Sequence, residues 1–218
     1  MHMQLIARFL GFFFQLLYHP FAWAYDLVSW IVSLGRWKDW VKSVVPFIEG
    51  TRVLELGHGP GHLQRILLDS GLLPFGLDAS RQMGFLAKKN LLKSGYAQTN
   101  IIRGIGQDLP FPVDTFDTIV ATFPAEYIFE GPALLEVRRT LKNGGRLIVL
   151  PVAWVTGLGV LDRFTAWLFR VTGQAPSDLS EESISRLVEP FHEAGLGIET
   201  ELLEVKSSHV LIVIAKKN

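Results

Sequence analysis

The sequence predicts an α/β fold in which a doubly wound, mainly parallel sheet ends in an antiparallel hairpin. From residue 50 onward, short segments rich in β-branched residues and leucine alternate with helix-like segments. A turn with three glycines joins the first of these strands to the first helix. Only residues 206–208 separate the last two strands. So short a connection requires an antiparallel pair, because parallel strands need a long crossover.

Helix-capping residues locate several of the helices between the strands. Asp178 and Glu181 have the spacing of a capping box for a helix over 179–194. A helix over 134–141 is expected to end at Lys142 to Gly145, because glycine and asparagine are frequent at helix C-termini. The other expected helices cover 62–70 and begin near Ser80, and the expected strands cover 52–57, 73–77, 101–105, 116–123, 146–150, 198–205 and 209–215.

The composition excludes several kinds of site. The 218 residues suit one domain with a substantial core. Lysine and arginine (21) balance aspartate and glutamate (21), so the chain lacks the excess of positive charge on which sequence-independent nucleic-acid binding depends. The absence of cysteine excludes disulfides, thiolate nucleophiles and zinc sites with sulfur ligands. No carboxylate or histidine cluster has metal-ligand spacing, so we expect neither a metal nor a nucleic-acid partner.

Apolar residues are concentrated at the N-terminus, where residues 1–40 hold 11 of the 25 aromatic residues. A signal peptide, a membrane span, a pair of interfacial helices and a buried lid are all consistent with this composition. Polar residues interrupt every window of the length that a span needs, so we interpret the segment as two helices, over 3–18 and 21–33. We therefore divide the chain into a lid or membrane-interface segment over 1–45 and a domain over 46–218.

Tryptophan recurs every seven residues in the N-terminal segment, at Trp23, Trp30 and Trp37. On a continuous helix this spacing places the three rings on one stripe. The stripe packs on the domain core, or it contacts a membrane interface, where tryptophan is enriched. Three basic residues follow it, either as a rim that faces lipid headgroups or as a solvated helix end: Arg36, Lys38 and Lys42.

The glycine-rich turn has the architecture that holds nucleotide-like ligands, a strand followed by a turn and a helix N-terminus. Gly57, Gly59 and Gly61 have the spacing G-x-G-x-G, and Glu55 precedes them. A dinucleotide fingerprint requires a glycine where this chain has His62, and the turn lacks the Gly-Lys-Ser/Thr of a P-loop. The turn therefore matches neither the NAD pattern nor the nucleoside triphosphate pattern.

An acidic residue at the end of the second strand strengthens the prediction of a ligand site. Asp78 lies 21 residues after Gly57, at a position where a carboxylate accepts both hydroxyl groups of a ribose. In the alternative, Asp78 only caps the helix that begins near Ser80. We favour the ribose role.

Four segments carry a family resemblance: VLELGHGPG (53–61), GLDAS (76–80), LPFPVDTFDTIVATF (109–123) and LLEVRRTLKNGGRLIVL (134–150). In this order they resemble the motifs of class I S-adenosylmethionine-dependent methyltransferases, in particular the methyltransferase-11 type, which includes quinone-biosynthesis enzymes. The resemblance covers residues 50–217. It implies a Rossmann-like doubly wound seven-stranded sheet with an antiparallel last strand, and S-adenosylmethionine as the cofactor.

The resemblance also implies roles for individual residues. The glycines of the turn would let the backbone approach the methionine end of the cofactor, with Glu55 near its amino group, and Asp78 would hold the ribose hydroxyl groups. Relatives usually carry aspartate at the position of Ile105, so adenine recognition would fall to the backbone of Gly106, or to Gln107 or Asp108. His58 would make a hydrogen bond in the turn, and Phe123 would line the sulfonium side. The expected cofactor-binding residues are Glu55, Gly57, His58, Gly59, Gly61, Asp78, Gly106, Gln107 and Phe123.

Methyl transfer from an activated sulfonium requires mainly alignment and the exclusion of water. A general base is needed only if the acceptor arrives protonated. Glu126 and Tyr127, just beyond the fourth strand, are the candidate catalytic residues, and His58 is a further candidate base. In the alternative, Glu126 lies on a solvated turn and Tyr127 in helix packing. Tyr25 resembles the tyrosine that closes over the active site in many relatives, so we expect it to contact the substrate.

Two apolar segments flank the domain architecture, over 1–45 and as an insert over 151–175. Arg163 and Arg170 lie seven apart in the insert and share a helix face, where they bind a phosphate of the substrate or form the polar side of an amphipathic helix. We expect an apolar or lipid-like acceptor, a phospholipid amine or a quinone precursor, and a cytoplasmic protein that is peripheral at the membrane. The alternatives are a soluble substrate, with the N-terminal helices as lid or dimer face, and a catalytically silent cofactor-binding scaffold.

Overall fold

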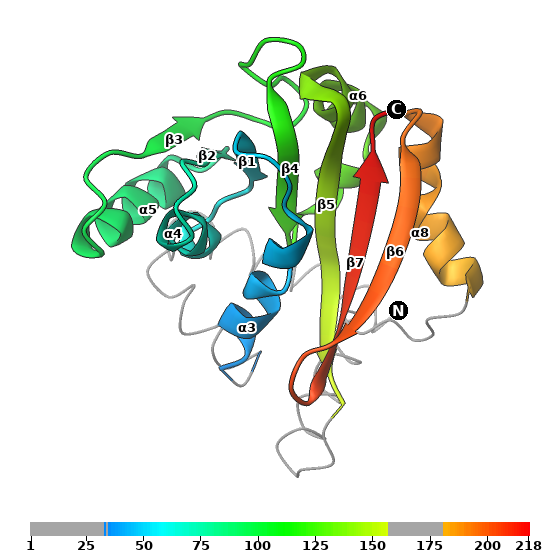
Figure 1. Ribbon diagram of the computed structural model, residues 1–218, viewed down its shortest axis with the longest axis horizontal. Coiled ribbons are helices and arrows are strands. Elements are labelled where there is room, and N and C mark those ends of the chain that lie inside the picture. Colours follow the sequence, from blue (N-terminus) through cyan, green and yellow to red (C-terminus); the bar gives the residue numbers. More distant parts are fainter. Residues whose placement is uncertain (1–32, 34, 157–180) are drawn as a thin grey trace, which may run out of the picture.

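The computed structural model describes residues 33, 35–156 and 181–218, and these form a seven-stranded sheet with helices on both faces (Figure 1). The strands are β1 Val53–Leu56, β2 Phe75–Asp78, β3 Asn100–Arg103, β4 Phe116–Thr122, β5 Leu141–Val155, β6 Gly197–Glu204 and β7 Ser208–Lys216. Their order is β3-β2-β1-β4-β5-β7-β6, in which β7 is antiparallel to both of its neighbours and the other pairs are parallel. The doubly wound sheet and its antiparallel hairpin are confirmed.

Two apolar clusters form the core, one on each face of the sheet. Because successive residues of a strand point to opposite faces, neighbours on β4 belong to different clusters. Val120 joins Leu63 of α4 in one cluster, and Ile119 joins Leu134 of α6 in the other. Coverage of both faces explains why the central strands β1 and β4 are mainly apolar and mostly buried. The helices are α3 Trp37–Lys42, η2 Val45–Phe47, α4 His62–Asp69, α5 Arg81–Lys93, η3 Glu126–Phe129, α6 Gly131–Thr140 and α8 Glu181–Glu193.

The helix end expected at Lys142 to Gly145 is wrong, because α6 already ends at Thr140. The loop before β4 binds the last carbonyl groups of this helix, and Thr115 N donates to the Thr140 carbonyl at 2.8 Å. A glycine cap is therefore not needed, and the chain turns directly into β5. The glycines lie instead near the start of β5, where Gly144 N donates to the Lys217 carbonyl at 2.8 Å.

β5 continues past its expected end at residue 150. It stays paired with β7 as far as Val155, opposite Ser208. Residues 151–155 of the apolar insert thus belong to the sheet, and the rest of the insert, residues 157–175, lies outside the described residues.

The two edges of the sheet are β3 and β6. β6 exposes three carboxylates, those of Glu199, Glu201 and Glu204. Lys216 of the neighbouring strand pairs with the first of them, at 2.7 Å between its Nζ and Glu199 Oε1. β3 has only four residues and ends in the exposed Arg103.

The described end of the N-terminal segment packs on the domain. Trp40 is buried, and the ring of Trp37 stacks on Phe123 with 4.3 Å between ring centroids. The described end of the tryptophan stripe thus packs on the core. Trp23, Trp30 and the helices expected over 3–18 and 21–33, except for residue 33, lie outside the described residues. Within the described ranges no helix is both long and apolar enough to cross a bilayer.

Candidate cofactor site

The strand order reverses between β1 and β4. In doubly wound sheets, ligands bind outside the carboxyl ends of the strands at this reversal. The glycine turn begins there, directly after β1, and Gly57 N donates to the carbonyl of Leu77 on β2 at 2.7 Å. At Gly59 the backbone has a φ of +50°, and an added Cβ would meet no atom within 4 Å. The turn therefore presents open backbone to a ligand, as the expected methionine site requires.

The carboxylate of Asp78 is bonded to the glycine turn. Its Oδ2 accepts from Gly59 N at 2.9 Å, and its Oδ1 accepts from Ser80 N at 2.8 Å. Ser80 is the residue that caps α5, since its hydroxyl accepts from Met83 N at 3.3 Å. The capping role considered for Asp78 is therefore wrong. Each of its carboxylate oxygens keeps a lone pair for a further donor.

Glu55 is a buried carboxyl group beneath the turn, with 2% of its surface exposed. Gln64 of α4 donates from Nε2 to Glu55 Oε2 at 2.8 Å. Burial raises the pKa of the Glu55 carboxyl to about 8, against the hydrogen bond from Gln64, and the negative charge of Asp78 adds to the rise. The carboxyl group is thus largely protonated at neutral pH, and a cation placed beside it would favour its ionised form.

His58 is buried within the turn and leaves one ring nitrogen unsatisfied. Its Nδ1 lies 2.7 Å from the carbonyl oxygen of Gly59 and donates to it, since a carbonyl only accepts. Nε2 is then an acceptor, and it is buried without a hydrogen-bond partner among the described residues. Burial lowers the pKa of this imidazole, although the nearby carboxylate of Asp78 opposes the shift. A neutral, enclosed ring fits a hydrogen-bond acceptor for a ligand better than a base that exchanges protons with solvent.

Tyr127 brings together the loops that follow β1 and β3. A Cβ built at Gly106 would lie 2.6 Å from Cε2 of the tyrosine ring, and one built at Gly57 would lie 3.4 Å from its hydroxyl oxygen. The ring also packs against the apolar core. The packing considered as the alternative for Tyr127 is therefore observed, and it places the ring between two loops of the candidate site. Gly106 has to be glycine because the ring occupies the space of a side chain.

The other residues expected after β3 and β4 lie nearer the surface. Glu126 is exposed in the first turn of η3 and makes no hydrogen bond or ion pair with the described residues. Gln107 donates from Nε2 to Glu130 Oε2 at 3.0 Å, so its amide is already bonded on the outside of the site. Ile105 is half-exposed.

Phe123 directly follows β4 and has a left-handed conformation, with a φ of +48°, which is strained for a residue with a bulky side chain. Trp37 stacks on its ring, and Trp40 lies at 6.1 Å between ring centroids. The backbone amide of Phe123 donates to the carbonyl of Leu150 at 2.8 Å. The structure thus places Phe123 under α3, so that an aromatic group covers the end of β4.

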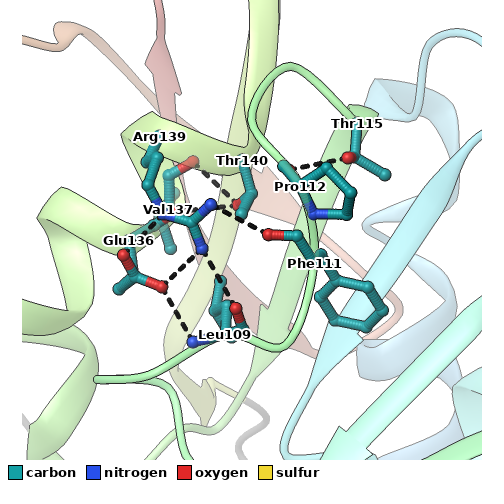
Figure 2. A network of polar contacts seen from close by, with 8 residues as sticks. All are labelled: Leu109, Phe111, Pro112, Thr115, Glu136, Val137, Arg139 and Thr140. Carbon is teal, nitrogen blue, oxygen red and sulfur yellow. Dashed lines mark hydrogen bonds and ion pairs between the residues drawn. The ribbon is translucent and has the colours of Figure 1, made fainter.

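Two groups of residues in and beside the site were not predicted from the sequence. One is Gln64, whose buried amide holds Glu55. The other is an ion pair on α6 that fixes the loop after Gly106 (Figure 2). Arg139 donates to the carbonyl oxygens of Leu109 and Phe111 at 3.0 and 2.8 Å, and the paired carboxylate, Glu136, accepts from Leu109 N at 2.8 Å. The one signal for this pair in the sequence is the spacing of Glu136 and Arg139, three residues apart on the expected helix over 134–141.

The structure does not describe the residues expected to bind the substrate. Tyr25, Arg163 and Arg170 all lie outside the described ranges. In residues 33, 35–156 and 181–218, no three histidine, aspartate or glutamate side chains lie close enough together to hold a metal ion.

A protein-family model described as the ubiE/COQ5 methyltransferase family matches residues 14–190. A demethylmenaquinone methyltransferase of Symbiobacterium thermophilum is 28% identical over 231 residues, which cover 92% of this chain and 91% of the relative. The ubiquinone/menaquinone biosynthesis C-methyltransferase UbiE of Rhizobium meliloti is 31% identical over 189 residues, which cover 78% of this chain and 73% of the relative.

Solved structures share the fold. A putative S-adenosyl-L-methionine-dependent methyltransferase from Methanococcus maripaludis matches with a TM-score of 0.65 and 20% identity, over 90% of this chain and 92% of that one. Phosphoethanolamine N-methyltransferase 2 of Haemonchus contortus, in complex with S-adenosyl-L-methionine, matches with a TM-score of 0.56 and 17% identity, over 84% of this chain and 53% of that one. At these identities the likeness concerns the fold alone.

We predict that Glu55→Gln stabilises the protein, and increasingly so as the pH rises from 4.5 to 8. The glutamate of the unfolded chain ionises near pH 4.5, whereas the folded carboxyl keeps its proton until about pH 8. Between these values the unfolded state binds fewer protons, so the wild-type free energy of unfolding falls with pH, by at most about 1.4 kcal/mol per pH unit for one group. The glutamine keeps the hydrogen bond with Gln64 and does not titrate.

Urea unfolding of both proteins at several pH values between 4.5 and 8.5 measures this difference. Gln64→Leu removes the donor and keeps the carboxyl group, so we expect its stability to go on falling to a higher pH than that of the wild type, because the Gln64 hydrogen bond lowers the pKa of the carboxyl. Parallel stability profiles for wild type and Glu55→Gln would contradict the raised pKa.

Proposed function

Because this chain belongs to the ubiE/COQ5 methyltransferase family, we propose that it methylates a quinone precursor, an apolar acceptor, at a membrane surface. The chain is an S-adenosylmethionine-dependent methyltransferase. One observation carries the choice of acceptor: the chain matches a demethylmenaquinone methyltransferase over 91% of that enzyme's length. The phospholipid amine considered from the sequence is the second candidate acceptor.

The residues of the candidate site fit S-adenosylmethionine. The buried carboxyl of Glu55 suits an ammonium group, because a cation would offset the cost of ionising it. Asp78 has free lone pairs for hydroxyl groups, and the unsatisfied Nε2 of His58 requires a donor. The turn at Gly59 is open to a ligand, and the loop at Gly106 is closed by Tyr127 on one side. The bound cofactor supplies a methyl group that its sulfonium has already activated.

We assign different tasks to the two candidate catalytic residues. Tyr127 contacts both loops of the site, so it is placed to align the acceptor and to exclude water. Methylation of a ring carbon replaces a ring hydrogen with the methyl group, so one proton has to leave the acceptor. Glu126 lies beside Tyr127 with an exposed carboxylate, and we propose that it takes this proton and passes it to solvent.

Membrane contact is proposed for the N-terminal segment, over 1–45. The support is its composition, with 11 of the 25 aromatic residues in the first 40 positions. Its described end covers Phe123 through Trp37, as a lid beside the site would. Tyr25, Arg163 and Arg170, on segments that the structure does not describe, remain our proposed substrate contacts.

We predict that Asp78→Asn weakens S-adenosylhomocysteine binding by about ten- to a hundredfold, because hydrogen bonds to a charged acceptor are lost. Isothermal titration calorimetry gives the affinity. Ser80→Ala is the control: it removes the cap of α5 but keeps the carboxylate and the Ser80 amide, so affinity should stay within about threefold of wild type while the helix loses stability. Equal affinities of wild type and Asp78→Asn would remove Asp78 from the site.

We predict that the protein transfers labelled methyl from S-adenosylmethionine to demethylmenaquinol with a short isoprenoid tail, and not to phosphatidylethanolamine in vesicles. Asp78→Asn is the control for site-specific turnover: at the same low cofactor concentration it should transfer much less methyl, because it binds the cofactor more weakly. Methylation of phosphatidylethanolamine alone would favour the phospholipid amine. Equal rates with and without the isoprenoid tail would favour a soluble substrate. Cofactor binding with no turnover of any acceptor would favour a silent scaffold.

We predict that Glu126→Gln lowers kcat by about a hundredfold, the usual effect of losing a general base, without changing affinity for S-adenosylhomocysteine. Glu126→Asp should recover part of the rate, because it restores a carboxylate. Tyr127→Phe keeps the ring against Gly106, so we expect it to change KM for the acceptor more than kcat. Wild-type kcat in Glu126→Gln would show that this carboxylate does not accept the proton.

A further inference from the structure

α5 and the edge strand β3 lie side by side at one edge of the molecule (Figure 1). Basic and apolar side chains are exposed on these two elements. α5 carries no acidic residue from Arg81 to Lys93. The chain as a whole has no net charge, so the positive charge is concentrated locally on this helix. The basic residues of this surface are Arg81, Lys88, Lys89, Lys93 and Arg103, all exposed.

Large apolar side chains project among these cations. Phe85 and Leu92 are each 62% exposed, and their spacing of seven places them on one stripe of α5. Single exposed apolar residues are common, but these two lie on the same helix face as the basic residues. The guanidinium of Arg81 lies over the ring of Phe85, at 5.3 Å from its centroid. The buried face of the helix is separate and packs through Met83, Ala87 and Leu91.

A cavity opens between α5 and β3. Three cations line it, Arg81, Lys88 and Arg103, together with Phe85. Arg103 is fixed at the rim, because its Nε donates to the carbonyl of Ala79 at 3.1 Å. Among the described residues that line the cavity, Asp78 is the one anion, and backbone amides already bond to both of its carboxylate oxygens. The cavity therefore suits a phosphate group.

We propose that this α5–β3 surface docks on a bilayer that contains anionic lipids, with Phe85 and Leu92 in the headgroup region and the cations on lipid phosphates. A helix with aromatic and aliphatic residues among cations is the usual form of an interfacial helix, and charge complementarity selects an anionic bilayer as the occupant. The inference rests on the proposed function for its membrane setting. It also deepens that function, because the surface begins at Asp78 and Ser80 and docking would bring the cofactor site to the bilayer that holds the acceptor.

Co-sedimentation of the full chain with vesicles tests the proposal, using phosphatidylcholine alone and phosphatidylcholine with phosphatidylglycerol. The test variant combines Phe85→Ser with Lys88→Gln. A matched control on α6 combines Leu135→Ser with Arg138→Gln, which have the same spacing and are also exposed. Melting temperature and S-adenosylhomocysteine affinity should be those of wild type in both variants.

We expect wild type and the control to bind phosphatidylglycerol vesicles more tightly than neutral vesicles, by a margin that shrinks as salt is added. The test variant should lose about tenfold or more of its binding to the anionic vesicles, and its preference for them over neutral vesicles should shrink, because it lacks one cation as well as the Phe85 ring. Three results would overturn the proposal: no preference of wild type for the anionic vesicles, equal losses in the test and control variants, or full competition by inorganic phosphate, which would indicate a site for free phosphate.

Measuring methyl transfer alongside vesicle binding distinguishes a failure of the docking surface from a failure of the proposed function. Methylation of a short-tailed acceptor in solution should be equal in wild type and the test variant. If wild type binds the anionic vesicles as expected but methylates no quinol, the proposed acceptor fails and the docking surface stands. If wild type methylates the quinol but shows no preference for anionic vesicles, the docking surface fails alone.

Discussion

The hydrogen bond from Gly59 N to Asp78 Oδ2 fixes the carboxylate against the glycine turn, and the arrangement of the site depends on it. The backbone bond from Gly57 N to the Leu77 carbonyl joins the same turn to β2. On its other side the turn rests on α5, where a Cβ at Gly61 would lie 3.1 Å from Cβ of Ala87. α5 is in turn capped by Ser80, whose amide also binds Asp78. The positions of the turn, the helix and the carboxylate are therefore set together, before any ligand arrives.

In the part of the chain that the structure describes, two buried polar groups of the site lack favourable partners that a bound ligand would supply. Glu55 keeps its proton because burial raises its pKa, and His58 buries an acceptor that has no donor among the described residues. Both arrangements reduce the stability of the free protein, since burial removes water without supplying a full set of partners. The left-handed backbone of Phe123 adds strain at the end of β4. Such unfavourable states concentrate where a protein is built for binding.

Local patterns in the sequence predicted most of the fold and the outline of the site. The strands, the hairpin and the glycine turn follow from hydrophobic periodicity and from turn residues, which act over a few positions. The missed features depend on contacts between distant segments. α6 ends at Thr140 because a loop before β4 binds its carbonyl groups, and Gln64 reaches Glu55 only when α4 packs on β1. Likewise, Tyr127 reaches Gly106 through the fold, and no spacing in the sequence records that contact.

The three glutamates along β6 affect how the protein behaves when concentrated. A chain with no net charge lacks the general repulsion that keeps many proteins apart in solution. An uncovered edge strand offers free backbone groups to the edge of another copy. Glu199 and Glu201 share one face of β6, so antiparallel docking of two β6 strands can oppose them with the same residues of the other copy, and Lys216 offsets only the charge of Glu199. Local charge at this edge therefore hinders growth of the sheet from molecule to molecule, where overall charge gives no protection.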